Sequence, residues 1–241
     1  ERYGGTMQAG GSDQWGNLTV GVELIRRSEG ARAHALATPL LTKSDGTKFG
    51  KTESGTVWLD PAMTSPYAFH QFFLNAEDSM VGSYLRIFSE RSRDELDELV
   101  RQSQEAPHLR AAQRALADDI TDLVHSPAER RAASDAAAAI FGRGELNELP
   151  ESVLSAVWRE LGAIRLEVGA ELPAVVDVLL AAGVVPSRSA ARRAIDEGGA
   201  YLNNQKVTDV ETRLTNDDLL AGRWVLLRRG KRTVGSVKLL G

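Results

Sequence analysis

The sequence predicts a chain of several domains: part of a parallel α/β domain, then an all-α domain, and finally a small α+β domain. Three observations predict this order. Residues 1–57 alternate strand-like runs with a helical pattern, residues 58–165 repeat apolar residues at helical spacing, and residues 166–241 combine two short helices with short strands. With 241 residues, the chain has room for two or three such domains.

The first 57 residues follow the element order of a parallel α/β sheet. The expected elements are a strand over Thr6–Ala9, a turn at Gly10-Gly11, a helix over Asn17–Ser28, a strand over Ala35–Thr42 and a polar loop over Lys43–Ser54. Two strands cannot form a buried parallel sheet, because both faces need cover and the edges need partners. We therefore expect the rest of this sheet to precede Glu1.

The middle of the chain is expected to be almost entirely helical from about Leu59 to Val168. Amphipathic patterns rich in Ala, Leu, Glu and Arg predict helices over Ser65–Leu74, Met80–Phe88, Arg93–Ser103, Leu109–His125 and Ala128–Phe141. The first of these is rich in aromatic residues, which we interpret as helix core in preference to a stacking platform.

The last part of the chain predicts a compact α+β unit. One short helix over Ala174–Ala182 ends at Gly183, and a second lies between the N-cap Ser187 and Gly198-Gly199. Short strands are expected over Ala200–Asn203, Lys206–Val207, Arg223–Arg228 and Thr233–Leu240, joined in pairs by turns at Asn203-Asn204 and Arg229-Gly230-Lys231.

Composition excludes several classes of protein. There is no cysteine, so neither a disulfide nor a thiolate metal site is possible, and the four histidines lack the spacing of metal ligands, which predicts no metal site. The longest apolar stretch, near Val175–Val185, is interrupted by Asp177 and is too short to span a bilayer. The chain does not open on a signal-peptide pattern, so we expect a cytoplasmic protein without a membrane segment.

Charge is distributed unevenly along the chain. The net charge is −4, but from Pro186 onward eleven basic residues face six acidic ones, which gives +5 there and leaves −9 for the residues before it. An acidic body with a basic end predicts a polyanionic partner for that end alone.

The glycine turn is the first candidate site. It reads Gly10-Gly11-Ser12-Asp13-Gln14-Trp15-Gly16-Asn17. Glycines at the carboxyl end of a strand allow a ligand to approach the backbone closely, and a helix N-terminus favours anionic groups. The Asp13 carboxylate can accept both hydroxyls of a ribose, and the Gln14 amide can orient a small polar substrate. The alternative interpretation is a tight turn in which Asp13 only caps the helix.

The polar loop is the second candidate site. Its centre reads Lys48-Phe49-Gly50-Lys51-Thr52, with Asp45 and Gly46 shortly before it. Two lysines around a glycine on a mobile loop suit transient neutralisation of a triphosphate. An ordinary charged surface loop is the alternative.

Both motifs, in this order and separation, closely resemble bacterial tyrosyl-tRNA synthetases. The resemblance extends over Gly11–Asn17 and Pro39–Thr52, where Lys48–Thr52 matches that family's version of the KMSKS signature of class I synthetases. It continues through Trp58–Pro61, Ser65–Tyr67 and Gln71–Phe73, and the chain as a whole is similar at varying strength. The resemblance implies a Rossmann-like catalytic domain over residues 1–57 and a helical domain over 58–165 that binds the anticodon region.

The resemblance also implies roles for individual residues. Tyrosine would be adenylated by ATP, accompanied by Mg²⁺, and then transferred to its tRNA. Lys48 and Lys51 would act catalytically on the β- and γ-phosphates, and Gln8 and Gln14 would bind tyrosine. The residues implied for ATP or adenylate binding are Gly11, Asp13, Leu40, Leu41, Lys48, Gly50, Lys51 and Thr52.

Residues 166–241 resemble the RNA-binding domain of ribosomal protein S-four type. The resemblance rests on Val184–Ile195 and Tyr201–Asn203. Arg188 and Arg192 lie four residues apart, on one face of the second predicted helix. The residues expected to contact RNA are Arg188, Arg192, Arg193, Tyr201, Lys206, Arg228, Arg229, Lys231 and Arg232. A solvated basic face is the alternative.

Two other functions stay open. One is a tryptophanyl-tRNA synthetase; the Gly11–Gly16 run and residues 166–241, here called the terminal module, both argue against it. The other is a non-catalytic RNA-binding protein derived from a synthetase. The family's His-x-Gly-His-type turn and phenol-binding groups do not occur in residues 1–241. We therefore expect half an active site, inactive alone, with homodimer contacts largely in the other half.

Overall fold

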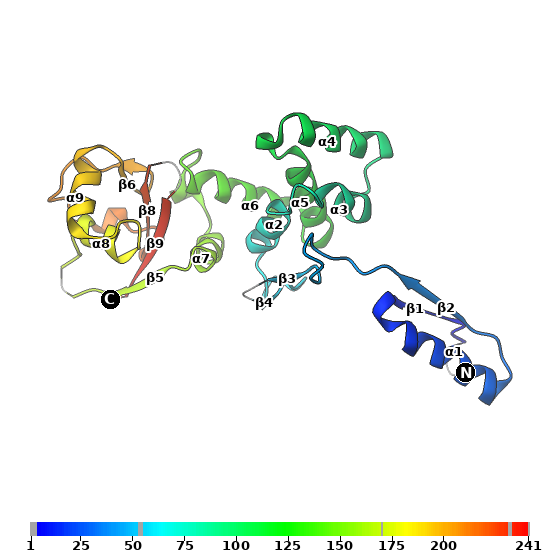
Figure 1. The fold of residues 1–241 in the computed structure, drawn as a ribbon. Helices are drawn as coiled ribbons and strands as arrows, with labels where there is room; N and C mark the ends of the chain where they lie inside the picture. Colours follow the sequence, from blue (N-terminus) through cyan, green and yellow to red (C-terminus); the bar gives the residue numbers. More distant parts are fainter. Residues whose placement is uncertain (1–3, 53–54, 170, 231–232, 241) are drawn as a thin grey trace. The chain divides into compact units, whose positions relative to one another are not determined.

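A computed structural model describes residues 4–52, 55–169, 171–230 and 233–240. The chain divides into two compact units, Glu1–Val57 and Trp58–Gly241 (Figure 1). In the described part of the chain, no helix is long and apolar enough to cross a membrane. Each unit is described by itself below.

The first unit is a two-stranded parallel sheet with one long helix. Strand β1 (Met7–Gly11) pairs with β2 (His34–Thr38) in the register Met7↔His34 to Gly11↔Thr38, and α1 (Trp15–Glu29) connects them. The helix ends at Gly30, whose φ of 64° is readily adopted only by glycine. The strand predicted over Ala35–Thr42 ends earlier, because Pro39 has no N–H to donate to the sheet.

Large apolar side chains of this unit remain exposed. Leu18 of α1 is buried, yet the exposed fractions of Met7, Val20 and Leu24 are 64%, 67% and 63%. A sheet of two strands leaves such side chains without cover. Two further short strands, β3 (Lys51–Thr52) and β4 (Gly55–Thr56), pair antiparallel at the end of the unit, where only a loop was expected up to Ser54.

The second unit begins with a layer of packed helices. They are α2 (Pro66–Leu74), α3 (Val81–Phe88), α4 (Arg93–Glu105), α5 (Ala111–Val124), α6 (Pro127–Ile140) and α7 (Glu151–Glu160). Local caps explain several helix starts: the Ser65, Ser92 and Ser126 side chains each accept a backbone N–H three residues on. Single 3-10 turns lie at η2 (Pro107–Leu109), η3 (Leu146–Glu148) and η4 (Asn216–Asp218).

The aromatic residues of α2 belong to the core of this layer. Phe69 and Phe73 are buried, and Phe69 contacts the ring of His125 edge-on at 4.8 Å. His70, 3% exposed, places Nε2 3.0 Å from Oδ1 of Asp118 on α5. These contacts hold α2 against α5, as the core interpretation of the aromatic run predicts.

The rest of the unit is a five-stranded sheet with two helices. Its members are β5 (Ile164–Glu167), α8 (Val175–Ala181), α9 (Arg188–Asp196), β6 (Ala200–Leu202), β7 (Gln205–Lys206), β8 (Trp224–Arg229) and β9 (Thr233–Leu240). The strand order is β5-β9-β8-β6-β7. The prediction of helix up to Val168 is wrong at β5, which pairs parallel to β9 in the register Ile164↔Val237. The boundary expected between residues 165 and 166 therefore falls inside this strand.

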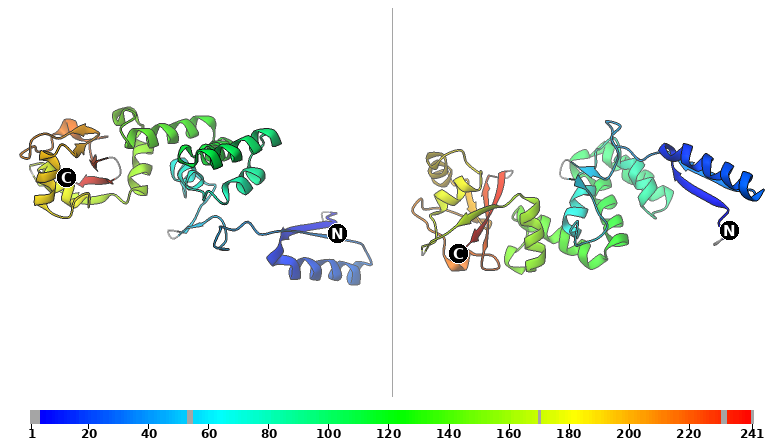
Figure 2. Two further views of the ribbon diagram at one scale, coloured as in Figure 1. Left: turned by 45° about the horizontal axis from the view of Figure 1, so that its top comes forward. Right: turned by 90° about the horizontal axis from the view of Figure 1, so that it is seen from below.

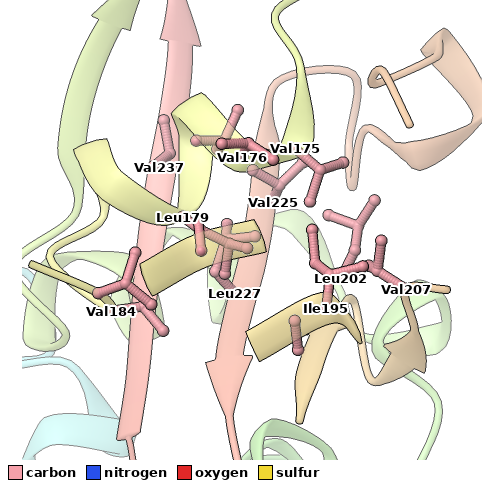
Figure 3. Close-up of a cluster of buried hydrophobic side chains, with 14 of the residues drawn as sticks. Val175, Val176, Leu179, Val184, Ile195, Leu202, Val207, Val225, Leu227 and Val237 are labelled. Carbon is pink, nitrogen blue, oxygen red and sulfur yellow. The ribbon is translucent and has the colours of Figure 1, made fainter. Parts of the chain in front are cut away.

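One face of the sheet carries α8 and α9 over a continuous apolar core. Figure 3 shows Val176 and Leu179 of α8 and Ile195 of α9 directed toward Val225 and Leu227 of β8. All five side chains are at most 5% exposed. The loop before α9 supplies the cap, since the Ser187 hydroxyl accepts the N–H of Ala190 at 3.2 Å.

The other face of the sheet packs on the helical layer. Trp158 of α7 and Trp224 of β8 are both buried, with ring centres 6.1 Å apart. In the β6–β7 turn, the Asn204 amide donates to the carbonyl of Ala139 near the end of α6 at 2.5 Å. Figures 1 and 2 show the sheet between α8 and α9 on one side and α7 on the other. Strand β8 is consequently buried on both faces.

The tight packing of β9 yields a stability prediction. A β-carbon at Gly235 would lie 2.5 Å from the carbonyl oxygen of Ala182 and 2.7 Å from a methyl of Val184. Gly235→Ala should therefore lower the free energy of unfolding by about 1–3 kcal/mol through overpacking. Gly169→Ala is the matched control, because no heavy atom lies within 4 Å of its β-carbon position. Urea unfolding of both variants measures the difference, and equal stabilities would contradict the packing.

Candidate functional site

The paired strands bring the glycine turn next to the segment after β2. Gly11 ends β1 opposite Thr38, and a β-carbon at Gly11 would lie 2.8 Å from Oδ1 of Asp13 and 2.9 Å from Cδ2 of Leu40. A side chain at this position would displace the ends of both side chains. Gly11, Asp13 and Leu40, all predicted nucleotide ligands, are therefore neighbours.

Asp13 lies in η1 (Ser12–Gln14), the 3-10 turn that leads into α1. Nζ of Lys48 lies 3.1 Å from its Oδ2, although 35 residues separate them in sequence. The hydrogen bond and the positive charge of Lys48 lower the pKa of Asp13 below its ordinary value, against the effect of desolvation. The two candidate motifs thus meet through opposite charges. An exposed ion pair of this kind contributes little to folding stability, so it matters mainly for the chemistry of the candidate site.

The loop that carries Lys48 is folded as a small hairpin. Thr42 and Lys48 form an antiparallel bridge, Phe49 N–H donates to the Leu41 carbonyl at 3.1 Å, and Lys43 N–H donates to the Thr47 carbonyl at 2.8 Å. Asp45 closes the turn by accepting the Thr47 N–H at 2.9 Å and its hydroxyl at 2.6 Å. Both hydrogen bonds lower the pKa of Asp45, and the bond from the Thr47 hydroxyl has the larger effect.

The structure also locates the other residues that are predicted to bind ATP or tyrosine. Leu41 pairs through its carbonyl with the residue after Lys48, so both are fixed by one hairpin. Gly50 follows with a φ of 84°, and Lys51 and Thr52 form β3, where the structure describes only their backbone. Gln14 ends η1, and the Oε1 of Gln8 on β1 lies against Gly21 of α1. Gln8 thus faces the helix.

Sequence reasoning gave no role to Asn17, the last residue of the glycine motif. Its Nδ2 donates to the Oε1 of Gln14 at 3.0 Å. The signal for this contact is the spacing of three residues at a helix start, which brings two side chains onto one face.

The basic residues of the terminal module differ in whether their side chains have a partner. Arg188 is ion-paired with Asp177 at 2.6 Å, and the ammonium of Lys206 lies against Gly198 at the end of α9. Arg192, Arg193 and Arg229 are exposed, and no hydrogen bond or ion pair of their side chains occurs among the described residues. Lys231 and Arg232 lie outside the described residues.

Tyr201 and Arg228 lie together on the sheet face that packs on the helices. They are paired residues of β6 and β8, and the Arg228 guanidinium lies 4.3 Å from the centre of the Tyr201 ring. A β-carbon at Gly142, just after α6, would lie 3.3 Å from Nη2 of Arg228. Among the described residues expected to contact RNA, three arginines lie on α9, whereas Tyr201 and Arg228 lie at the junction with α6.

Comparison with known proteins gives the class of this chain. Residues 2–142, more than half of the chain, match the family of tRNA synthetases class I (W and Y). The chain belongs to this family. Residues 162–235 also match the tyrosine--tRNA ligase SYY-like C-terminal domain.

Several curated relatives are similar over nearly the whole chain. A tyrosine--tRNA ligase of Cutibacterium acnes is 60% identical over 237 residues, 98% of this chain. Ligases of the same name from Thermobifida fusca and Streptomyces coelicolor are 57% and 56% identical over 99% and 100% of it. The chain spans 56% of the length of each of these three relatives.

The Lys48–Asp13 contact leads to a titration prediction. The Asp13 carboxyl should titrate below its ordinary pKa, and Lys48→Met should raise that pKa. Because the folded pKa is the lower one, any stabilisation by the pair is present above the unfolded pKa and lost as pH falls through the folded value. A pH titration followed by NMR of the carboxyl group measures the Asp13 pKa in wild type and in Lys48→Met. Asp45 is the internal control, since its pKa is lowered by Thr47 and should not respond to Lys48→Met. An Asp13 pKa that stays constant would contradict the pair.

Proposed function

We propose that this chain forms part of an enzyme that joins tyrosine to its tRNA, a tyrosine--tRNA ligase. The observation that carries the proposal is the apposition of Asp13 and Lys48, one from each motif of the synthetase family. The match of residues 162–235 to a tyrosine--tRNA ligase C-terminal domain favours tyrosine over tryptophan. Such an enzyme serves translation, so we expect it in the cytoplasm.

The proposed reaction has two steps. The tyrosine carboxylate attacks the α-phosphorus of ATP, which forms tyrosyl-adenylate and releases pyrophosphate. A terminal ribose hydroxyl of the tRNA then attacks the tyrosyl carbonyl and releases AMP. Mg²⁺ accompanies the ATP and neutralises part of the phosphate charge.

The site residues divide this work by chemistry. Asp13 accepts hydrogen bonds from the ribose hydroxyls, and Gly11 lets the sugar approach the backbone. Leu40 and Leu41 give the adenine an apolar contact. Gln14 holds the tyrosine carboxylate, Gln8 supports the amino-acid pocket, and the backbone of Gly50 and Thr52 follows the phosphates.

In the proposed complex with nucleotide, Lys48 changes its partner. Ribose hydroxyls that bind Asp13 would compete with the Lys48 ammonium, which lies 3.1 Å from its Oδ2. We infer that the ribose displaces Lys48, which then turns to the β- and γ-phosphates with Lys51. The hairpin supports this, because Gly46 and Gly50, with φ of 80° and 84°, flank the segment that moves.

The terminal module and the helices are proposed to bind tRNA. Arg192 and Arg193 on α9 and Arg229 at the end of β8 are exposed cations that suit phosphate contacts. The helical layer is proposed to contact the anticodon region. By analogy with the family, the complete enzyme is a homodimer whose interface lies in the part that its longer relatives have and this chain lacks.

The lysines give a kinetic test in the complete enzyme that contains this chain. Lys48→Ala and Lys51→Ala should each slow adenylate formation about a hundredfold, near 3 kcal/mol, because each meets charge that develops on the departing pyrophosphate. Tyrosine affinity should hardly change. Quench-flow measurement of tyrosyl-adenylate tests this, and Lys43→Ala, a lysine of the same hairpin, is the control. Wild-type rates in both variants would remove the assigned role.

Binding of tRNA gives a second test. Replacing Arg192 and Arg193 together with Ala should weaken cognate and non-cognate tRNA by similar factors, since phosphate contacts carry no sequence information. The logarithmic salt slope should become flatter by about 1 to 2. The control removes Arg26 and Arg27, two exposed arginines of α1 that pair with Glu23. A loss confined to the cognate tRNA, or an unchanged slope, would show that α9 is not the phosphate surface.

A further inference from the structure

A cavity lies among three helices of the second unit. Helix α2 packs against both α6 and α7, and the cavity that their side chains line has a volume of about 360 Å³. Small side chains account for this space, since α6 contributes Ala132 and Ala133 and α7 contributes Ser155 and Ala156. Protein interiors rarely contain a void much larger than a water molecule, and small-molecule sites begin near this size. The cavity is therefore a candidate binding site.

Tyr67 of α2 brings a buried polar group to this cavity. The residue lines the cavity and is only 7% exposed, and no hydrogen bond of its hydroxyl occurs among the described residues. Burial raises the pKa of Tyr67 to about 12, and the negative charge of Glu160 adds to this rise. The hydroxyl is therefore protonated and can donate a hydrogen bond. Because buried polar groups of native proteins nearly always have a partner, a ligand in the cavity is expected to supply one.

Two side chains of opposite charge line the same cavity. Glu129 lies in the first turn of α6, and Arg159 lies in the last turn of α7. Both are exposed, and neither forms an ion pair with any residue in the described part of the chain. Since the two side chains do not pair with each other, each can hold a ligand group of the opposite charge.

The two charges select the chemical class of the ligand. A purely anionic ligand would be repelled by Glu129, and a purely cationic one would be repelled by Arg159. A small zwitterion is attracted by both. The apolar side chains of Pro66, Ala133 and Val153 also line the cavity and would cover a hydrocarbon group. A free aliphatic amino acid carries all three features.

We propose that this cavity binds a free aliphatic amino acid in its zwitterionic form. Arg159 holds the carboxylate, Glu129 holds the ammonium group, and the hydroxyl of Tyr67 donates to the carboxylate. The lining residues all belong to residues 61–159 of the second unit, whereas the proposed nucleotide ligands belong to the first unit. This binding therefore goes beyond the proposed function and does not depend on it.

The test is calorimetric titration of the complete enzyme with L-leucine. Saturable binding is expected with a Kd of about 1 mM, as suits so small a ligand. Isocaproate has the same skeleton without the ammonium group, and isoamylamine has it without the carboxylate. Each should bind about tenfold more weakly than L-leucine, because each loses one charge-assisted contact. The absence of saturable L-leucine binding, or equal binding of either analogue, would overturn the proposal.

Variants of the lining residues locate the binding. Arg159→Met should weaken L-leucine binding about tenfold and Tyr67→Phe about fivefold, because each removes one contact to the carboxylate. Arg131→Met is the control, since Arg131 is an exposed arginine of α6 that does not line the cavity, and it should bind like wild type.

A measurement of thermal stability separates lost binding from lost folding. Without ligand, Tyr67→Phe should melt at the wild-type temperature, because the hydroxyl that it removes has no partner in the described part of the chain. Wild-type affinity for L-leucine in both Arg159→Met and Tyr67→Phe would place the binding elsewhere in the enzyme and overturn the site.

Discussion

The candidate site depends on the parallel pairing of β1 with β2. In the observed register Gly11 lies opposite Thr38, so the chain leaves both strands at the same edge. Parallel strands require a crossover between them, and α1 provides it. As a result, Asp13 follows the end of β1 and Leu40 follows the end of β2. A β-carbon at Gly11 would lie close to both side chains. A shift of the register by one residue would turn every side chain of β2 to the other face and separate the two motifs.

Local signals in the sequence were sufficient to predict most of the helices and antiparallel strands. Ser65, Ser126 and Ser187 mark helix starts through bonds that span three residues, and the Asn203-Asn204 turn joins β6 to β7. Strand β5 was missed because its partner β9 is separated from it by α8, α9, β6, β7 and β8. Only three residues separate it from helix α7, and the stop signal among them, Gly162 with a φ of 63°, was not used in the prediction. Non-local parallel pairing leaves no pattern in so short a segment.

The candidate site was predicted in part from chemistry and in part from resemblance. Glycines, a carboxylate and paired lysines indicate nucleotide chemistry, but no spacing rule places Lys48 beside Asp13. That contact depends on the hairpin closed by Asp45 and Thr47, whose geometry emerges only in three dimensions.

The two-sided burial of β8 limits how the terminal module can meet RNA. Trp224 and Leu226 face the core shared with α7, whereas Val225 and Leu227 face the core under α8 and α9. All four are at most 4% exposed, so the central strand offers no base a surface on which to stack. Tyr201 carries Arg228 on its ring and lies beside the Gly142 turn. If the module binds RNA as proposed, its contacts would be restricted to the outer side of α9 and to the strand ends, where exposed arginines can reach phosphates. In the proposed enzyme, sequence discrimination would then come from other parts.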